Sequence, residues 1–291
     1  RPSLYAPVRH PARLGPGATT WTIERIVERC IASEHLIPVT PAGHPHVLTS
    51  RELADVEQRF LAALDTPLQV PALPSTLTEQ VIADRETLGA DQADAVRTIA
   101  AGTAPVAVMI GPAGTGKTFT LDTIRTTYES AGLRVIGAAP SARASLELEA
   151  GAHIASRTLQ SLIQQWDTGH DRPDRRTLLV IDEAGMADIR TLEHVVTRQL
   201  AAGGRVLLVG DHHQLPEVGA GGGFAHAATH AHTIAQLHIN RRQRQPWEQA
   251  ALTELRDGTF YAVINMQRNG TPLAISSRPG EAIALAVRLE C

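Results

Sequence analysis

The sequence has 291 residues and a globular composition, 43% hydrophobic and 20% charged, which provides enough apolar material for a sizeable core. The formal net charge is −3, so an overall basic excess is lacking, and any contact with DNA must come from a local arrangement of arginines. Two cysteines make no disulfide framework, and no apolar run approaches the roughly 20 residues that a membrane-spanning helix needs. We therefore expect a cytoplasmic protein without a membrane span and, because the sequence begins with Arg1, a piece of a longer chain.

The N-terminal part of the sequence predicts a small helical domain between two linkers. Residues 1–18 are rich in proline and glycine, which is typical of a linker. Apolar residues recur at helical spacing within 23–31, and two short apolar runs around Pro and Gly within 36–48 predict a hairpin. We place a small helical domain at residues 19–66, for which a winged-helix-like fold is one option, and a second linker at residues 67–86.

A helix start signal lies near the end of this small domain. Thr49 and Glu52 have the spacing of a capping box, in which two side chains each satisfy a backbone N–H at the start of a helix. The apolar residues behind them recur at helical spacing and would share one face: Leu53, Val56, Phe60 and Leu64.

From residue 88 onward the pattern changes to strands alternating with helices. Helices are predicted at 118–130 and 187–202, and Gly132 and the pair Gly203–Gly204 mark their ends. Continuous apolar strands that alternate with helices are typical of a parallel sheet covered on both faces, so we predict an α/β fold. The strand-like runs lie at residues 105–110, 134–139, 177–182, 205–211 and 233–238.

The segment "GPAGTGKT" follows one of these runs and opens a helix, which is the context of a phosphate-binding loop. Its glycines let the backbone wrap closely around phosphate, and its N–H groups and the helix N-terminus point at the anion. The alternative is a chance glycine-rich turn. We assign nucleotide contacts to the loop and to the residue after it: Gly111, Pro112, Ala113, Gly114, Thr115, Gly116, Lys117, Thr118 and Phe119.

Lys117 in this loop is the only lysine of the chain, although lysine and arginine together number 27. Lysine is a compact charge on a flexible stem that reaches the β- and γ-phosphates inside a tight loop, whereas the planar guanidinium of arginine does not fit the same space. A sequence that drifts toward arginine can replace surface lysines but not this one. We therefore predict that Lys117 is catalytic.

The run "LLVIDEAGM" places Asp182 and Glu183 at the carboxyl end of a buried strand, where ligands bind in open α/β sheets. We expect Asp182, through water, and Thr118, directly, to hold Mg²⁺. Glu183 is predicted to orient or deprotonate the attacking water. The alternative is that the two carboxylates cap the next helix.

The run "LLVGDHHQLPEVGAGGGF" ends the next strand, and Gln214 follows it closely enough for its amide to contact a γ-phosphate. Several histidines lie here and in "HAATHAH", which raises the question of a metal site. Neither cysteines nor carboxylates accompany them at ligand spacing, so solvated histidines are the favoured interpretation over zinc ligands.

The order of these motifs resembles superfamily 1 helicases of the RecD-like branch, and more closely the helicase part of conjugative relaxases of the TraA/TraI (MobF) type. The resemblance covers roughly residues 88 to 270, and its most family-specific piece is "RRQRQPWEQAALTELRDG". It implies a RecA-like P-loop NTPase lobe at residues 87–270, followed at 271–291 by the truncated start of a second lobe. It also implies ATP and Mg²⁺ as cofactors and single-stranded DNA as partner, together with other proteins of the conjugation machinery, in a bacterial cytoplasm.

The resemblance also implies roles for residues outside the phosphate-binding loop. Gln92 in "LGADQADAV" would contact adenine, and Gln214 would couple the nucleotide state to DNA. Arg242 in "NRRQ" would act as an arginine finger on the γ-phosphate, where it would neutralise charge in the transition state. The alternative for this arginine and its neighbour Arg241 is a surface charge cluster.

Contacts with DNA are implied for "APSARAS" and "SRTLQSL". Ser141 and Arg143 would meet the phosphates of the single strand, and Thr158 matches another DNA-contacting motif. The alternative for these residues is ordinary helix capping.

The sequence departs from the family in what it lacks, since neither a nicking domain nor a complete second lobe is found. One lobe alone is expected to bind ATP weakly and not to translocate. We interpret the chain as the ATP-binding and hydrolysing motor lobe of a DNA helicase that acts on single-stranded DNA in conjugative transfer. Two alternatives stay open: a stand-alone RecD-like DNA repair helicase, and a nucleotide-binding interaction module without turnover.

Overall fold

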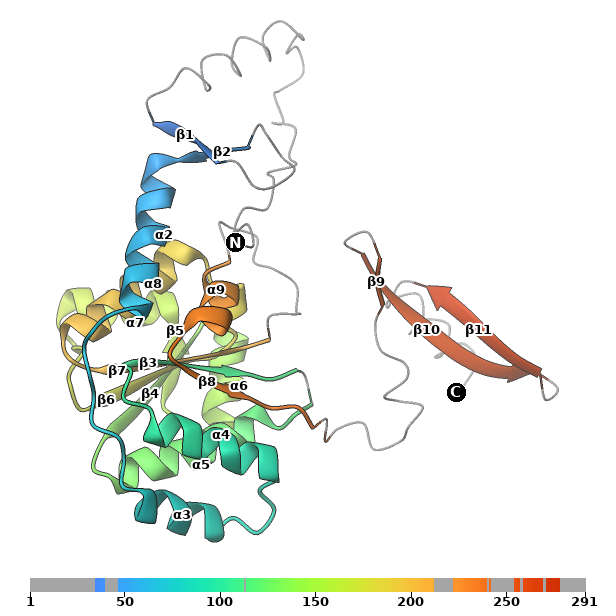
Figure 1. Cartoon of the computed structure of the whole chain (residues 1–291), viewed down its shortest axis with the longest axis horizontal. Coiled ribbons are helices and arrows are strands. Elements are labelled where there is room, and N and C mark those ends of the chain that lie inside the picture. The colour runs from blue at the N-terminus through green and yellow to red at the C-terminus, as the bar shows by residue number, and fades with distance from the viewer. Residues whose placement is uncertain are drawn as a thin grey trace, which may run out of the picture. The chain divides into compact units, whose positions relative to one another are not determined.

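A parallel sheet carries the predicted motifs in the computed structural model, which describes residues 35–39, 47–112, 114–211, 222–239, 241, 254–256, 259–268 and 271–277. All neighbouring strands of this sheet run parallel, as predicted. The strand order is β5 (Ser156–Thr158), β4 (Arg134–Ala139), β6 (Thr177–Ile181), β7 (Arg205–Gly210), β3 (Val106–Ile110) and β8 (Thr233–Gln236) (Figure 1).

Helices cover both faces of the sheet and produce two hydrophobic cores (Figure 1). Along β3, Val106 and Val108 face one core while Ala107 and Met109 face the other, because side chains alternate along a strand. One core is completed by α4 (Ala90–Ala101), α5 (Lys117–Ser130) and α6 (Ala142–Ala152). The other is completed by α2 (Arg51–Leu64), α7 (Leu159–Thr168), α8 (Ile189–Ala201) and α9 (Gly223–His230).

Helix α2 belongs to this lobe, which corrects the small separate domain predicted at residues 19–66. The Phe60 side chain is 0% exposed within the core, and Arg59 forms an ion pair with Glu193 of α8 at 2.8 Å. The described residues up to Ile239 accordingly belong to one compact unit. The sequence pattern showed that α2 has an apolar face, but not which surface that face covers.

The segment between α2 and the sheet is also more structured than the predicted linker at residues 67–86. It contains α3 (Ser75–Ala83), which packs against α4 and α5. Before α3, the backbone N–H groups of Val70 and Leu73 donate to carbonyl oxygens of Thr103 and Ala100, each at 2.8 Å. These hydrogen bonds attach the segment to the end of α4.

The structure confirms the predicted hairpin, and the N-cap of α2 lies one residue later than predicted. Strands β1 (Leu36–Val39) and β2 (Val47–Ser50) pair antiparallel. The hydroxyl of Ser50, rather than that of Thr49, accepts a hydrogen bond from the N–H of Leu53 at 3.1 Å, because Ser50 is the residue that directly precedes α2. The helix predicted within 23–31 and the linker at 1–18 lie outside the described residues.

The described residues from Arg241 onward belong to a second compact unit, and the predicted end of the lobe at residue 270 stays a prediction. The described strands of the second unit are β9 (Glu254–Arg256), β10 (Thr259–Arg268) and β11 (Thr271–Ser277), which form an antiparallel sheet. The pairing of β10 with β11 runs from Arg268↔Thr271 to Ala262↔Ser277.

Candidate nucleotide-binding site

The predicted phosphate-binding loop connects the end of β3 to the start of α5. Gly114 and Gly116 have φ angles of 85° and 81°, a left-handed conformation that favours glycine. Within the loop, the hydroxyl of Thr115 donates to the carbonyl oxygen of Pro112 at 2.9 Å. Ala113 lies outside the described residues. The strand–loop–helix context that a phosphate-binding loop requires is thus present, and phosphate binding itself stays a prediction.

The side chain of Lys117 folds back over this loop. Its Nζ donates to the carbonyl oxygen of Gly111 at 2.6 Å and is 3.4 Å from that of Pro112. The ammonium group therefore lies against the backbone of the first two residues of the loop. Thr118, at the first turn of α5, is exposed, and the ring of Phe119 is half-buried beneath the guanidinium of Arg85 at 5.7 Å.

Asp182 and Glu183 follow β6 directly, and their surroundings raise both pKa values. Burial raises the pKa of Asp182, although the N–H of Glu183 and the charge of Lys117 oppose it. Burial, followed by the charges of Asp182 and Glu147, raises the pKa of Glu183. Because β3 and β6 run parallel on either side of β7, the loop with Lys117 and the two carboxylates lie at the same edge of the sheet.

Neither Asp182 nor Glu183 caps α8, the next α-helix, so the capping alternative is wrong for this helix. Asp188 caps α8, since its Oδ1 accepts from the N–H of Thr191 at 3.0 Å. Glu183 precedes the short 3-10 helix η1 (Ala184–Met186) without a side-chain cap and has a φ of 51°, which is uncommon for a residue with a side chain. Both carboxylates therefore remain available for chemistry at the edge of the sheet.

The side chain of Gln92 is hydrogen-bonded to the backbone of the phosphate-binding loop. Its Nε2 donates to the carbonyl oxygens of Gly116 at 3.1 Å and Thr115 at 3.4 Å, and its Oε1 accepts from the N–H of Gly89 at 2.9 Å. The side chain is buried, with a relative exposure of 1% for the residue. The amide that the resemblance assigns to adenine is thus engaged with the backbone of the loop.

A family profile described as "AAA domain" matches residues 87–273, which is more than half of the chain. The chain belongs to the AAA domain family. The matched segment begins just before Gln92 and contains the phosphate-binding loop and both carboxylates.

Relatives of this AAA domain confirm the resemblance drawn from its motifs. A conjugal transfer protein TraA of Agrobacterium fabrum is 38% identical over 59% of the chain, and a probable TraA of Sinorhizobium fredii is 37% identical over 63%. The ATP-dependent RecD2 DNA helicase of Deinococcus radiodurans is 29% identical over 84% of the chain. The chain spans 15%, 16% and 35% of these relatives, respectively, so it corresponds to a minor part of each.

The residues predicted to contact DNA lie at the carboxyl ends of neighbouring strands of the AAA domain. Ser141 is the N-cap of α6 and Thr158 the N-cap of α7, and each side chain accepts a backbone N–H at 3.1 Å. The capping alternative is therefore correct as a description of these two side chains. Arg143 is different, because its side chain is 89% exposed and pairs with Glu147 at 2.8 Å.

Sequence reasoning missed Asp91, the neighbour of Gln92. Its Oδ2 accepts the N–H groups of His238 and Ile239, each at 3.1 Å, and so holds the segment after β8 against the start of α4. An acidic residue in the first turn of a helix was the available signal. Gln214 and Arg242, which were predicted to be catalytic, lie outside the described residues.

The histidines of α9 form a stacked pair in the AAA domain. The rings of His226 and His230 lie 4.0 Å apart and nearly parallel. In the described part of the chain, no group of three or more His, Cys, Asp or Glu side chains could hold a metal ion. Over the same residues, no helix combines the length and the apolar character needed to cross a membrane.

Proposed function

We propose that this AAA domain is the ATP-binding and hydrolysing motor lobe of a bacterial DNA helicase that acts in conjugative transfer. The observation that carries the proposal is that the loop with Lys117 follows β3 and that Asp182 and Glu183 follow β6, at the same carboxyl edge of one parallel sheet. A lysine in a glycine loop opposite a carboxylate pair is the arrangement that phosphoryl transfer requires. The TraA relatives support conjugation as the setting.

The donor groups at this site fit Mg²⁺ and a nucleoside triphosphate. The exposed Thr118 hydroxyl and the Asp182 carboxylate are oxygen ligands of the kind that Mg²⁺ prefers, and Asp182 would act through water. The loop N–H groups and Lys117 suit a polyphosphate. When bound, Mg²⁺ would neutralise part of the negative charge of the phosphates.

Each side chain then has a role that follows from its chemistry. Lys117 would exchange the carbonyl oxygen of Gly111 for phosphate oxygens. Glu183 would orient the attacking water and accept its proton, for which a pKa above the usual carboxylate value is favourable. Gln214 and Arg242 are proposed to complete the site on the γ-phosphate side.

Gln92 and Phe119 are proposed to form the part of the site nearest the nucleotide base. The half-buried ring of Phe119 follows Thr118 directly and offers an apolar surface. Gln92 would contact adenine only after its amide leaves the loop carbonyl groups, which makes its primary contribution the shape of the loop.

Single-stranded DNA is proposed to cross the carboxyl edge of the sheet near α6 and α7. The exposed Arg143 can exchange Glu147 for a phosphate group, and the starts of both helices present N–H groups to it. Ser141 and Thr158 would contribute by capping these helices in the correct position. Other proteins of the conjugation machinery are further proposed partners, in the bacterial cytoplasm.

A DNA repair helicase remains the second candidate, because the alignment with the RecD2 helicase covers the largest share of the chain, 84%. Calorimetric titration with ATP, with and without Mg²⁺, tests the nucleotide site. Steady-state hydrolysis with and without single-stranded DNA tests the motor function. Mg²⁺-dependent ATP binding without DNA-stimulated hydrolysis would favour a nucleotide-binding module without turnover.

A further inference from the structure

The C-terminal end of α6 lies against the first turn of α5, where the proposed magnesium ligand Thr118 is located. A Cβ atom added at Gly151 would lie less than 3.0 Å from the Cγ2 atom of Thr118, a separation that real Cβ atoms do not show. Glycine is therefore the residue that allows α6 to approach Thr118 this closely. The Thr118 methyl group packs against the bare backbone of Gly151.

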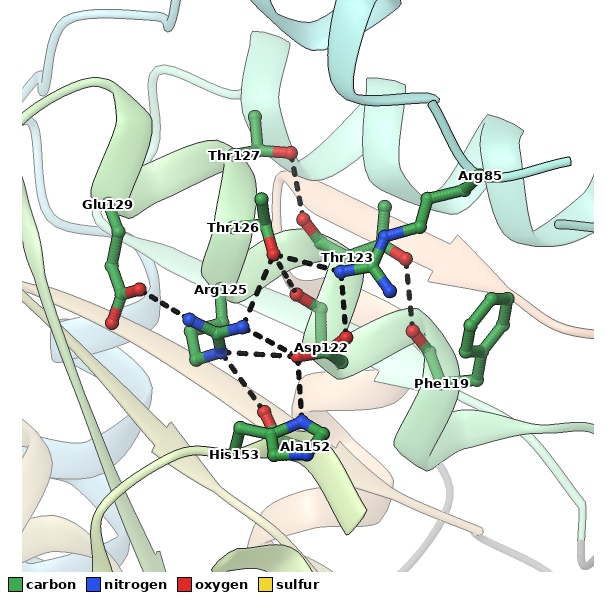
Figure 2. Close-up of polar contacts among 10 residues, drawn as sticks. All are labelled: Arg85, Phe119, Asp122, Thr123, Arg125, Thr126, Thr127, Glu129, Ala152 and His153. Carbon is green, nitrogen blue, oxygen red and sulfur yellow. Dashed lines mark hydrogen bonds and ion pairs between the residues drawn. The ribbon is translucent and has the colours of Figure 1, made fainter. Parts of the chain in front are cut away.

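A cluster of charged side chains around Asp122 holds this end of α6 in place (Figure 2). Asp122 of α5 accepts from Arg125 at 2.7 Å and pairs with Arg85 at 2.8 Å. Its Oδ1 is also 3.1 Å from Nδ1 of His153, the residue that ends α6. Arg125 additionally donates from Nε to the carbonyl oxygen of Ala152 at 3.2 Å.

The carboxylate at the centre of this cluster is buried, while its partners are partly or largely exposed. The Asp122 side chain is 7% exposed, so its charge requires these partners. The two arginines come from α5 and from the turn after α3, while His153 and Ala152 belong to the end of α6. Three separate elements therefore meet at one carboxylate, one helical turn beyond Thr118.

We propose that Gly151 is a positioning residue for Thr118, an inference that rests on the proposed nucleotide site. Threonine is branched at Cβ, so its methyl group and hydroxyl rotate together about χ1. Contact of the methyl group with the Gly151 backbone fixes this rotation and thereby the direction of the hydroxyl toward Mg²⁺. The Asp122 cluster keeps α6 close enough for the contact to persist.

The test compares ATP affinity at saturating Mg²⁺ with ATP affinity in EDTA, by calorimetry, for the whole chain. Gly151→Ala forces the Thr118 methyl group to rotate, and we expect the Mg²⁺-dependent gain in affinity to fall by about 10- to 100-fold. The melting temperature should stay unchanged or rise, because alanine is the better helix former. Glu149→Ala, an exposed change on the same helix, should leave the gain unchanged.

A rescue variant separates this role from ordinary packing. Serine at position 118 keeps the hydroxyl and lacks the methyl group, so Gly151→Ala combined with Thr118→Ser should match Thr118→Ser alone. Equal losses from Gly151→Ala in both backgrounds would overturn the proposal, because the effect would not pass through the methyl group.

A second variant covers the case in which Gly151→Ala does not fold. His153→Gly removes the ring contact with Asp122 and suits the φ of 55° at this position, so the helix end should remain intact. We expect a several-fold smaller Mg²⁺-dependent gain, and an unchanged gain would overturn the proposal. If the unaltered chain binds ATP with the same affinity with and without Mg²⁺, the proposed function is wrong as well. If its affinity depends on Mg²⁺ and Gly151→Ala does not change that dependence, only the present inference is wrong.

Discussion

The side-chain amide of Gln92 donates a hydrogen bond to the carbonyl oxygen of Gly116, the last residue before α5, at 3.1 Å. The N–H of Gly89, the residue just before α4, donates to the oxygen of the same side-chain amide at 2.9 Å. Gln92 therefore joins the beginning of α4 to the phosphate-binding loop. The loop that would carry the phosphates is held by a residue distant in sequence.

Gln92→Ala is expected to weaken the binding of ATP and GTP by similar factors. The change removes the hydrogen bonds that join α4 to the carbonyl oxygens of Thr115 and Gly116, a loss of about 1–3 kcal/mol that does not depend on the base. Calorimetry with both nucleotides measures it, and Gln80→Ala on the exposed surface of α3 is the matched control. A loss confined to ATP would show that Gln92 recognises adenine instead.

Lys117→Arg should weaken triphosphate binding nearly as much as Lys117→Ala. Both variants should keep the fold, since Nζ of Lys117 donates to carbonyl oxygens of the loop and its side chain is not part of either hydrophobic core. The arginine variant keeps the charge but brings a planar group too broad for the loop. Nucleotide affinity and melting temperature are the measurements. Full affinity in the arginine variant would remove the explanation for the single lysine.

Glu183→Gln should retain Mg-ATP binding and lower hydrolysis by about 10²- to 10⁴-fold, because only the proton acceptor is lost. The base works in its deprotonated form, so a raised pKa places the acid limb of the rate profile above the pH expected for an ordinary glutamate. Glu147→Gln removes one cause of that raised pKa. It should therefore move the acid limb to lower pH. An unchanged acid limb would show that the charge of Glu147 does not influence Glu183.

Asp122→Asn should destabilise the lobe by about 2–3 kcal/mol at neutral pH, less than for a fully buried pair because its arginine partners are partly exposed. Burial alone would raise the pKa of Asp122, but hydrogen bonds from Arg125 and His153 and the charge of Arg85 outweigh burial and lower it. The stabilisation is thus complete above the unfolded pKa of about 4 and is lost as pH falls through the lower folded pKa.

Urea unfolding of Asp122→Asn across pH measures this effect. The difference from the unaltered chain should shrink below about pH 4. Asp94→Asn is the matched control, because Asp94 also pairs with an arginine three residues later but is 73% exposed. Its effect on stability should be far smaller, and equal effects would show that burial of Asp122 is unimportant.

Phe60→Ala should destabilise the same cooperative unit that contains the nucleotide site, by about 3–5 kcal/mol. The ring is fully buried where α2 meets the lobe. Leu68→Ala, at a partly exposed residue, should have little effect. Unfolding followed by near-ultraviolet circular dichroism and by loss of nucleotide binding should coincide. Two separate unfolding transitions would instead support the separate domain predicted at residues 19–66.

The sequence by itself determined the elements whose signals are local. Buried strands appear as continuous apolar runs, and the β3, β4, β6 and β7 strands were predicted to within one residue. The phosphate-binding loop needs glycines and a lysine at set spacing, and Asp182 and Glu183 must follow a strand. These features lie within a few residues of one another, so their pattern is visible along the chain.

Only the tertiary structure decided which distant segments meet. The apolar face of α2 predicted burial, but the partner of that face is α8, far along the chain. Gln92 is joined to Gly116, and Gly151 to Thr118, by contacts between separate elements that no local pattern encodes. The Asp122 cluster likewise requires three elements to converge, because a buried charge is stable only where its partners are brought to it.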